Sequence, residues 1–327
     1  MREFKINAND AGQRLDKFIQ KTVKGMPVSL MYKAIRLKKI KVNRKRAEQK
    51  QILAVGDVVQ MFLNEDLFAE KIADRELLSM TPNINVLYED ENIILCNKPA
   101  GILVHSGDGD GKTSGDGSVN DRNTLVYHMQ AYLAQNGEYD PADENSFAPA
   151  LCNRIDRNTG GIVIGAKNAQ TLRDINARIR DNYISKYYLC AVHGKLPEKS
   201  NVLKDFLVKN SNTNTVKVLK TYKPGAKEII TKYSVVDYNK SKDLSLLEIE
   251  LITGRTHQIR AHMASIGHPL AGDGKYGTNE FNKKTGRKTQ ALYSYKLRFN
   301  FKDENELSYL NGKTFEVSDV PFAKEIL

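Results

Sequence analysis

Residues 153–168 read NRIDRNTGGIVIGAKN, and we expect the fold to be organised around this stretch. The apolar run Ile162–Ile164 is bounded by glycines and predicts a buried strand. Asp156 precedes that run, so its carboxylate is expected in a loop that enters the sheet, where catalytic groups are common. Positive charge from Arg154 and Arg157 favours the ionised carboxylate, which can act as a nucleophile. On this segment alone, an ordinary surface ion pair is the alternative interpretation.

The composition predicts a globular protein of two domains, because 327 residues with 40% hydrophobic side chains suffice for a sizeable core. The three cysteines, Cys96, Cys152 and Cys190, match neither a disulfide framework nor a metal-ligand spacing, which indicates a reducing, cytoplasmic location. The opening residues MREFKIN lack the apolar segment of a signal peptide. No stretch approaches the roughly 18 apolar residues that span a bilayer, so we expect no membrane partner.

The positive charge is concentrated near the N-terminus. The net charge is +11, and residues 14–46 hold 12 lysines and arginines against a single acid, Asp16, so the rest of the chain is close to neutral. A basic face of this density implies a polyanionic partner, and nucleic acid is favoured over a merely solvated surface.

Residues 1–64 are expected to form a small α/β RNA-binding domain. Helical spacing at Leu15, Phe18 and Ile19, and again at Leu30, Ala34 and Leu37, predicts a pair of short helices, the second capped by Ser29. Residues 40–43 and 56–63 resemble short strands. The residues expected to contact RNA are Lys33, Arg36, Lys38, Lys39, Lys41 and Arg44.

Residues 65–83 are interpreted as a linker, and residues 84–327 as the second domain. A hairpin is predicted over 84–106, with Lys98 as either a phosphate contact or an exposed side chain. The Gly- and Asp-rich stretch 106–123 fails the pattern of a calcium-binding EF-hand loop and is expected to be a flexible loop. A helix follows over 124–136.

The remaining pattern predicts an α+β fold. Helical spacing over 168–181, strands over 183–192 and 216–252, a helix and Gly-rich loop over 254–277, and a strand over 291–301 give a mainly antiparallel, mixed sheet with flanking helices. Thr253 or Thr256 is the expected cap of the helix after 254, and Gly267 its end. Tyr187 is expected to point away from Tyr188, to the opposite sheet face.

Four ordered strings carry a resemblance to a known family. They are NKPAGILVH, NRIDRNTGG, SKYYLCAVHG and LITGRTHQIRAHMASIGHPLAGDGKYG. In order and spacing they resemble the large-subunit type (RluA-like) pseudouridine synthases, over nearly the whole chain. The N-terminal strings R-L-D-K-F, V-N-R and G-D-V-V are similar to an alpha-L RNA-binding domain.

The resemblance implies isomerisation of selected uridines in structured RNA, with large-subunit ribosomal RNA favoured. By position, Asp156 matches the family's nucleophile, Tyr188 the tyrosine that stacks on the flipped base, and Arg255 an arginine that holds the carboxylate ionised. Arg154, Arg157 and Lys186 match residues expected to contact RNA. Attack at C6 of the uracil and attack at C1′ of the ribose both remain open. No cofactor or metal is required, and a monomer is expected.

Other functions compete with this interpretation. Transfer RNA is the alternative substrate, and a non-catalytic RNA-binding or ribosome-assembly factor on the same fold is the alternative class. A glycosidase needs a second acid across the bond, and we identify no candidate for it in the matching motifs. A nucleobase deaminase is excluded because the H-x-E and P-C-x-x-C zinc signature is missing from the sequence. His257 and His262 lack the spacing of a zinc helix and are assigned structural roles. Lys275 and Tyr276 are interpreted as RNA contacts or loop residues.

Overall fold

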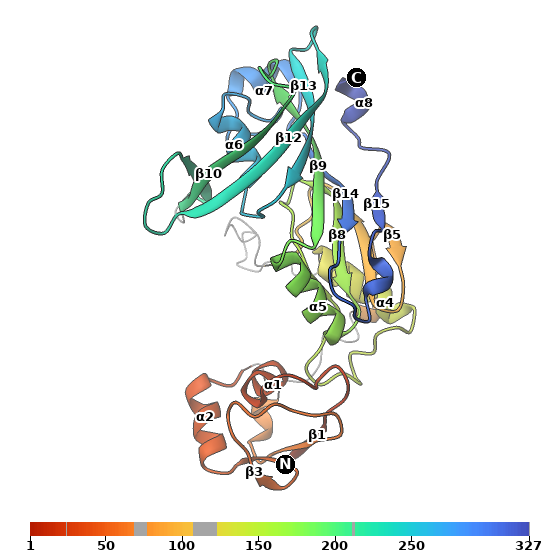
Figure 1. Ribbon diagram of the computed structural model, residues 1–327. Helices are drawn as coiled ribbons and strands as arrows, with labels where there is room; N and C mark the ends of the chain where they lie inside the picture. The colour runs from red at the N-terminus through yellow and green to blue at the C-terminus, as the bar shows by residue number, and fades with distance from the viewer. Residues whose placement is uncertain (24, 69–76, 107–122, 211–212, 327) are drawn as a thin grey trace.

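The computed structural model describes residues 1–326 except 24, 69–76, 107–122 and 211–212. We call residues 1–68 the N-terminal module and residues 77–326 the sheet unit. Figure 1 shows an elongated molecule with the module at one end and the C-terminus near the other. The Gly- and Asp-rich loop predicted at 106–123 falls almost entirely outside the described residues, so it remains a prediction.

The N-terminal module is a four-stranded sheet with helices packed on it. The strand order is β1-β4-β2-β3, and the core includes Phe18, Met31 and Val59. Its elements are β1 (Arg2–Lys5), α1 (Leu15–Thr22), α2 (Val28–Arg36), β2 (Ile40–Val42), β3 (Lys45–Arg46), β4 (Val58–Met61) and a 3₁₀ turn at Glu65–Leu67. The predicted helices and short strands are therefore confirmed.

The buried face of α2 differs from the predicted face. Met31, Ala34 and Ile35 are buried, whereas Leu30 is 39% and Leu37 is 55% exposed. Both sets have helical spacing, so periodicity did not distinguish them. Which of the two sets is buried depends on the side of the helix that faces the module's sheet. The exposed leucines therefore lie on the surface together with the basic side chains of this segment.

The sheet unit contains an 11-stranded sheet in the described residues. Its order is β11-β10-β12-β13-β9-β14-β8-β6-β5, with β15 beside β14 and β7 beside β8. The strands are β5 (Val86–Glu89), β6 (Ile93–Lys98), β7 (Ala150–Leu151), β8 (Gly160–Ala166), β9 (Ile184–His193), β10 (Ser200–Asn210), β11 (Thr215–Leu219), β12 (Lys227–Asn239), β13 (Leu244–Leu251), β14 (Leu292–Phe299) and β15 (Thr314–Glu316). All paired neighbours are antiparallel except β14 and β8. The predicted α+β class is confirmed.

Helices cover both faces of the central strands. They are α4 (Leu125–Gln135), α5 (Ala169–Arg180), α6 (Gln258–Ser265), α7 (Asn279–Thr285) and α8 (Ala323–Ile326), with a 3₁₀ turn at Ser308–Leu310. On β8, Val163 packs in one cluster with Met129 of α4, while Ile162 and Ile164 pack in another with Ile175 of α5. This two-sided burial is why the strand is a continuous apolar run, and it confirms the predicted core strand.

One long strand was missed and two helix caps were wrongly predicted. β10 precedes the predicted strands and forms a hairpin with β11 that projects from the sheet (Figure 1). The helix α2 begins after Pro27 rather than Ser29, and the residue before α6 is His257 rather than Thr253 or Thr256. His257 adopts the left-handed conformation, with φ 53°, so α6 begins without a side-chain cap.

The N-terminal module is attached to the sheet unit by polar contacts. The buried carboxylate of Asp10 accepts hydrogen bonds from Ser146 Oγ at 2.6 Å and from Asn145 Nδ2 at 2.6 Å. Asn9 contacts Glu144 and accepts a bond from the backbone N–H of Ala169 at 3.0 Å. A charged group without such partners is costly to bury, so these contacts hold the two parts in one orientation.

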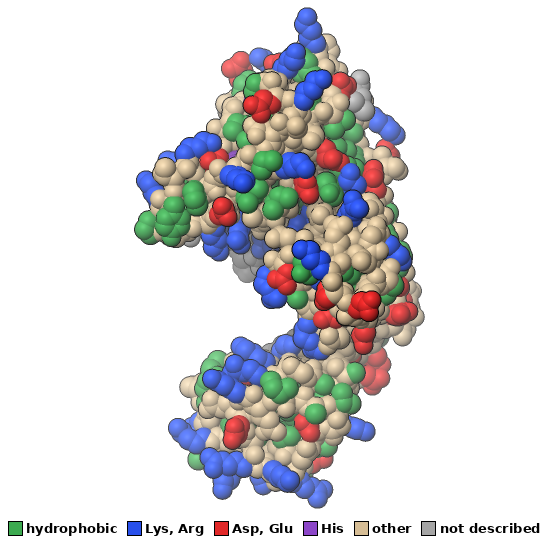
Figure 2. Space-filling model, viewed as in Figure 1, with side chains coloured by type: hydrophobic (Ala, Val, Ile, Leu, Met, Phe, Trp, Pro, Cys, Tyr) green, Lys and Arg blue, Asp and Glu red, His purple; other side chains and the backbone are tan. Residues whose placement is uncertain are grey.

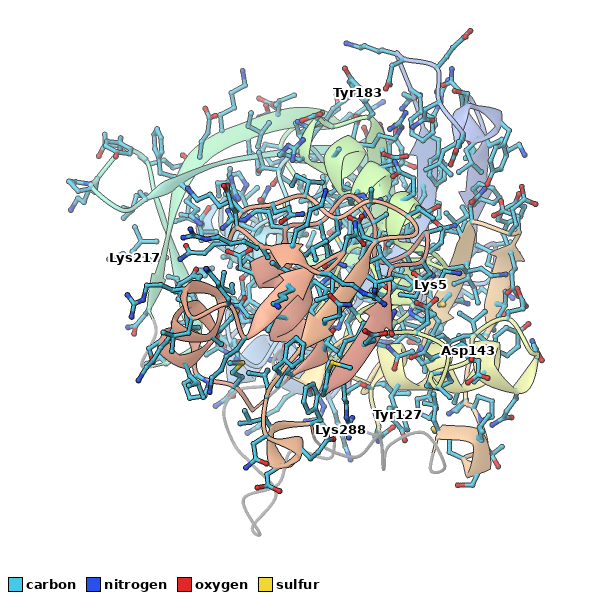
Figure 3. The ribbon with its side chains drawn as sticks, turned by 90° about the horizontal axis from the view of Figure 1, so that it is seen from below. Lys5, Tyr127, Asp143, Tyr183, Lys217 and Lys288 are labelled. Carbon is cyan, nitrogen blue, oxygen red and sulfur yellow. The ribbon has the colours of Figure 1, made fainter. Side chains whose placement is uncertain are left out.

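This orientation creates a hollow between the module and the sheet unit. Figure 2 shows lysine and arginine side chains on both sides of that hollow. In Figure 3, viewed from the side of the module, Lys217 of β11 and Asp143, between α4 and β7, lie on opposite sides of the module's ribbon. The ends of the segment predicted as a linker are packed, because Phe68 belongs to the core of the module and Leu77 packs against α4.

Candidate active site

Strand register brings the sequence motifs together. Ser294 of β14 lies opposite Gly161 of β8 on one side and opposite Tyr188 of β9 on the other. A Cβ atom on Gly161 would stand 2.1 Å from Ser294 O, and its φ of +116° is strained for other residues. The glycine therefore permits the close approach of β8 and β14, and the loop before β8 delivers Asp156 to the neighbourhood of Tyr188.

These residues line a pocket of about 500 Å³. Asp156, Tyr188 and Arg255 are on its wall, as are Arg154 and Lys186. The other walls come from the end of α5, from β13 and from the first turn of α6. Five of the six site residues predicted in the sheet unit thus surround one cavity, whereas Arg157 does not line it.

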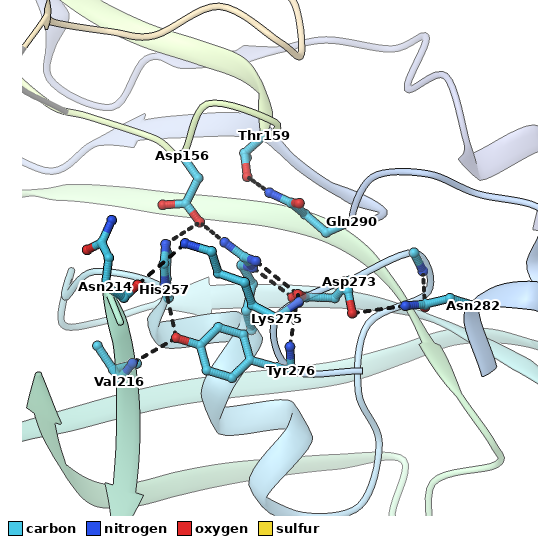
Figure 4. Close-up of polar contacts among 12 residues, drawn as sticks. Asp156, Thr159, Asn214, Val216, His257, Asp273, Lys275, Tyr276, Asn282 and Gln290 are labelled. Carbon is cyan, nitrogen blue, oxygen red and sulfur yellow. Dashed lines mark hydrogen bonds and ion pairs between the residues drawn. The ribbon is translucent and has the colours of Figure 1, made fainter. Parts of the chain in front are cut away.

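The carboxylate of Asp156 is held by Arg260 (Figure 4). Arg260 Nη1 donates to Asp156 Oδ2 at 2.9 Å, and the same guanidinium is held by Asp273 through Nε at 2.7 Å and Nη2 at 2.9 Å. Burial works to raise the pKa of Asp273, but the bonds from Arg260 outweigh it, so that pKa is lowered. Although burial opposes the charge on Arg260, these two carboxylates raise its pKa. Asp156 therefore faces a fixed, permanently charged donor.

The ion pairs of Asp156 involve residues other than the expected ones. Arg255 is exposed, and among the described residues the ion pairs of Asp156 are with Arg260 and His257. Arg157 donates from Nε to Gly101 O at 3.0 Å instead. Arg260, on α6, reaches the carboxylate from another part of the chain.

His257 and Tyr276 were not predicted as site residues, yet the structure places them beside Asp156. His257 Nε2 lies 3.9 Å from Asp156 Oδ2, and His257 Nδ1 lies 2.9 Å from the hydroxyl of Tyr276. Burial lowers the pKa of His257, although Asp156 opposes that effect. Sequence spacing held no signal for this contact, because it depends on the left-handed backbone at His257.

Tyr188 is buried in the wall of the pocket, with only 5% of its surface exposed. Burial raises its pKa to about 12, so the phenol is protonated at neutral pH. Tyr187 packs in the cluster on the other face of the sheet, as its alternating position predicts. Lys186 is also buried in the pocket wall, and burial lowers its pKa.

Lys98 is neither exposed nor placed to contact phosphate, contrary to both predictions. Its ammonium group is fully buried and donates to the carbonyls of Pro99, Ile102 and Arg157 at 2.8 to 2.9 Å. Burial lowers the pKa of Lys98 to about 7, and Asp156 opposes the shift. By holding Arg157 O, Lys98 supports the loop that carries Asp156.

The basic residues predicted on the N-terminal module are solvent-accessible. Lys33, Arg36, Lys38, Lys39 and Arg44 are exposed, and Lys41 is half-buried with Nζ 5.5 Å from the ring centre of Phe62. Exposed cations beside an exposed aromatic ring suit contact with RNA phosphates and bases.

The described residues contain no group of three or more histidine, cysteine or acidic side chains suited to hold a metal ion. His262 is instead bonded to Thr231 and Asp205 in the interior. No helix within the described part of the chain is both long enough and apolar enough to span a membrane.

A pocket that holds a carboxylate beside a buried tyrosine is the kind of site found in enzymes. A family model described as RNA pseudouridylate synthase matches residues 92–265. The chain belongs to this family, and it is an RNA pseudouridine synthase. This confirms the predicted family and activity over the non-catalytic alternative.

Several relatives carry related names. The chain is 29% identical to ribosomal large subunit pseudouridine synthase C of Vibrio parahaemolyticus, over 94% of this chain and 91% of that protein. It is 32% identical to the synthase of the same name from Haemophilus ducreyi, over 90% of this chain and 87% of that protein. It is 30% identical to an uncharacterized RNA pseudouridine synthase of Mycoplasma genitalium, over 91% and 88%.

Solved structures agree on the fold. Human RNA pseudouridylate synthase domain containing 1 has a TM-score of 0.56 at 19% identity, over 75% of this chain and 87% of that one. Human RNA pseudouridylate synthase domain containing 4 has a TM-score of 0.51 at 20% identity, over 72% and 88%. At these low identities, both comparisons show that the fold is shared.

Proposed function

We propose that this enzyme isomerises uridines of large-subunit ribosomal RNA, with Asp156 as the nucleophile. The printed names of the relatives support this substrate. The observation that carries the chemistry is the bond between Arg260 and Oδ2 of Asp156, which leaves a carboxylate in the pocket beside Tyr188. We expect the enzyme to act as a monomer.

The reaction exchanges one bond of the uridine for another. The N1–C1′ bond breaks, C5 bonds to C1′, C5 loses its hydrogen as a proton, and N1 gains a proton. Asp156 donates an electron pair either to C6, which moves the C5–C6 pair toward the C4 carbonyl, or to C1′, which expels the base with the glycosidic pair. Its covalent bond is broken again before release, so the carboxylate is regenerated.

Tyr188 is proposed to stack on the flipped base and to take part in removing the C5 proton. Stacking of one base on an aromatic ring contributes about 1–3 kcal/mol. Because the phenol is protonated at neutral pH, proton removal through its oxygen requires transfer by way of an ordered water or a change of charge nearby.

Lys33, Arg36, Lys38, Lys39, Lys41 and Arg44 are proposed to bind RNA phosphates, and Arg154, Arg157 and Arg255 to contact the RNA at the pocket mouth. Flipping a base out of a helix costs a few kcal/mol. Contacts between cations and phosphates release counterions and offset that cost. This function requires no cofactor, since carboxylate, phenol and bound RNA contain all the atoms of the reaction.

The test measures release of tritium from C5 of uridine in purified large-subunit ribosomal RNA, with transfer RNA in parallel. Wild-type protein is expected to release tritium from the ribosomal RNA, and Asp156→Asn to lower the rate by several orders of magnitude. Asp319→Asn is the matched control, because Asp319 is an exposed carboxylate that pairs with Lys324, and neither residue lines the pocket.

Each outcome decides one part of the proposal. Release from transfer RNA alone would move the substrate to transfer RNA. Normal release by Asp156→Asn would place the nucleophile elsewhere. No release from any cellular RNA by the wild-type protein would overturn the proposed reaction.

A further inference from the structure

Two hydrogen bonds and one longer polar contact connect the β10–β11 hairpin to the proposed nucleophile. The backbone N–H of Val216, on β11, donates to the hydroxyl of Tyr276 at 2.9 Å. That hydroxyl lies 2.9 Å from His257 Nδ1, and His257 Nε2 lies 3.9 Å from Asp156 Oδ2. Figure 4 shows these groups converging below the carboxylate.

The donors and acceptors in these contacts determine which imidazole nitrogen carries the proton. A backbone N–H can only donate, so the oxygen of Tyr276 accepts from Val216. Burial raises the pKa of Tyr276, which keeps its hydroxyl proton available for His257 Nδ1. The neutral imidazole then carries its own proton on Nε2 and points it toward the negative charge of Asp156. The opposite tautomer would place a lone pair against the carboxylate.

The backbone at His257 supports a functional role. Its left-handed conformation, with φ 53° and ψ 19°, costs on the order of 1–3 kcal/mol. The ring packs edge-on against Tyr276, with centres 5.7 Å apart, and its side chain is 9% exposed. Strain of this kind persists only where the surroundings hold it, and here it aims the ring into the pocket.

Both donors approach the same oxygen of Asp156. Arg260 Nη1 is 2.9 Å and His257 Nε2 is 3.9 Å from Oδ2, while no described residue is recorded as a partner of Oδ1. A catalytic contact that is long in the free enzyme often shortens when substrate binds. The two oxygens of the carboxylate are therefore inequivalent before the RNA arrives.

We propose that His257 is a positioning residue: Tyr276 fixes its tautomer, its Nε2–H restrains Oδ2 of Asp156, and Oδ1 is thereby presented to the uridine as the attacking atom. This inference rests on the proposed role of Asp156 and deepens it. The electron-pair movements are those given above for either attack point, and His257 neither gains nor loses a proton in them.

The proposal predicts a pH effect. The titratable and charged groups around His257 are Asp156, Arg260, Asp273, Lys275 and Tyr276. Acidification protonates Nδ1, which breaks the bond accepted from Tyr276 and places an imidazolium on the carboxylate that must attack. The rate is therefore expected to fall on the acid side as His257 titrates, below the ordinary pKa of histidine because burial lowers it.

The test uses the full chain with three variants. Tyr276→Phe keeps the ring and deletes the hydroxyl, His257→Leu deletes both nitrogens, and His257→Gln restores a donor near the position of Nε2. Tyr295→Phe is the matched control, because its hydroxyl contacts Glu248 away from the pocket. Thermal unfolding establishes that each variant is folded, and tritium release from C5 gives kcat and KM at several pH values.

We expect Tyr276→Phe and His257→Leu to lower kcat about 10-fold with KM little changed. The first variant no longer fixes the tautomer that points Nε2–H at Asp156, and the second removes that donor to the carboxylate. His257→Gln is expected to retain most of the rate and to lack the acid-side fall due to imidazole. Wild-type kcat in Tyr276→Phe, or a Gln variant as slow as the Leu variant, would overturn the inference. Absence of tritium release from the wild-type protein would instead overturn the proposed function.

Discussion

Replacing Arg260 with lysine tests whether this arginine, rather than Arg255, holds the proposed nucleophile, Asp156. Arg260 makes three charge-assisted hydrogen bonds, two to Asp273 and one to Asp156, and its side chain is 7% exposed. Lysine keeps the charge, but its compact ammonium group lacks the planar fork that spans both carboxylates. We therefore expect Arg260→Lys to leave the buried carboxylate of Asp273 incompletely paired.

The expected loss of stability is about 3 kcal/mol, the value of one to two hydrogen bonds to a charged group. In a domain of this size each kcal/mol lowers Tm by about 2–4 °C, so the shift is about 6–12 °C. Loss of the donor to Asp156, at about 2 kcal/mol, lowers the single-turnover rate about 30-fold. The assays are thermal unfolding and tritium release at saturating RNA.

Arg255→Lys is the matched control. Arg255 is exposed, so this substitution is expected to change stability by less than about 0.5 kcal/mol and to act on RNA affinity rather than on the rate at saturation. If Arg260→Lys turned over at the wild-type rate while Arg255→Lys was inactive, the assignment of the guanidinium to Arg260 would be wrong.

Three further predictions concern other parts of the molecule. The double substitution Lys38→Gln and Lys39→Gln leaves the contacts of Asp10 with the sheet unit intact. It should lower the slope of log binding constant against log salt concentration by about 0.7–0.9 for each lost phosphate contact. An unchanged slope would show that these lysines do not touch RNA. Tyr188→Phe should bind RNA and stall before C5 proton loss, which wild-type tritium release would contradict. The folded-state pKa of Asp273 is lowered, so its ionised carboxylate stabilises the fold above the unfolded pKa of about 4, and this stabilisation is lost as pH falls through the folded value. Asp273→Asn lacks this stabilisation at every pH. Its acid unfolding, monitored by circular dichroism, should therefore begin at a higher pH than that of the wild-type protein.

Local patterns accounted for most of the secondary structure. The glycine-bounded run at Ile162–Ile164 became β8, and the helices predicted over 124–136 and 168–181 became α4 and α5. These elements were predictable because periodicity and turn residues act over a few positions. The order of the motifs was also sufficient to indicate the family, because a motif is recognised from its own residues and does not depend on which strands pack beside it.

Where two interpretations had the same period, the sequence did not choose between them. On α2, Leu30 and Leu37 fitted a helical face as well as Met31 and Ile35 did, and only packing against the module's sheet showed which pair is buried. Lys98 was predicted at the surface because lysine is rarely buried. Its three carbonyl acceptors, one of them 59 positions away, exist only after the loop around Arg157 has folded over it.

The sequence by itself determined that an aspartate, a tyrosine and several arginines occur in motifs of an RNA-modifying enzyme, next to a basic module. Tertiary structure decided which of them meet. Asp156 and Arg260 are 104 positions apart, and their contact depends on the register of β8, β14 and β9 and on the left-handed entry into α6. Composition and spacing specify which side chains are available, but the direction of a side chain is set by backbone angles and by packing against strands that are distant in sequence. That direction made Arg260 and His257, rather than the arginines next to it in sequence, the ion-pair partners of Asp156.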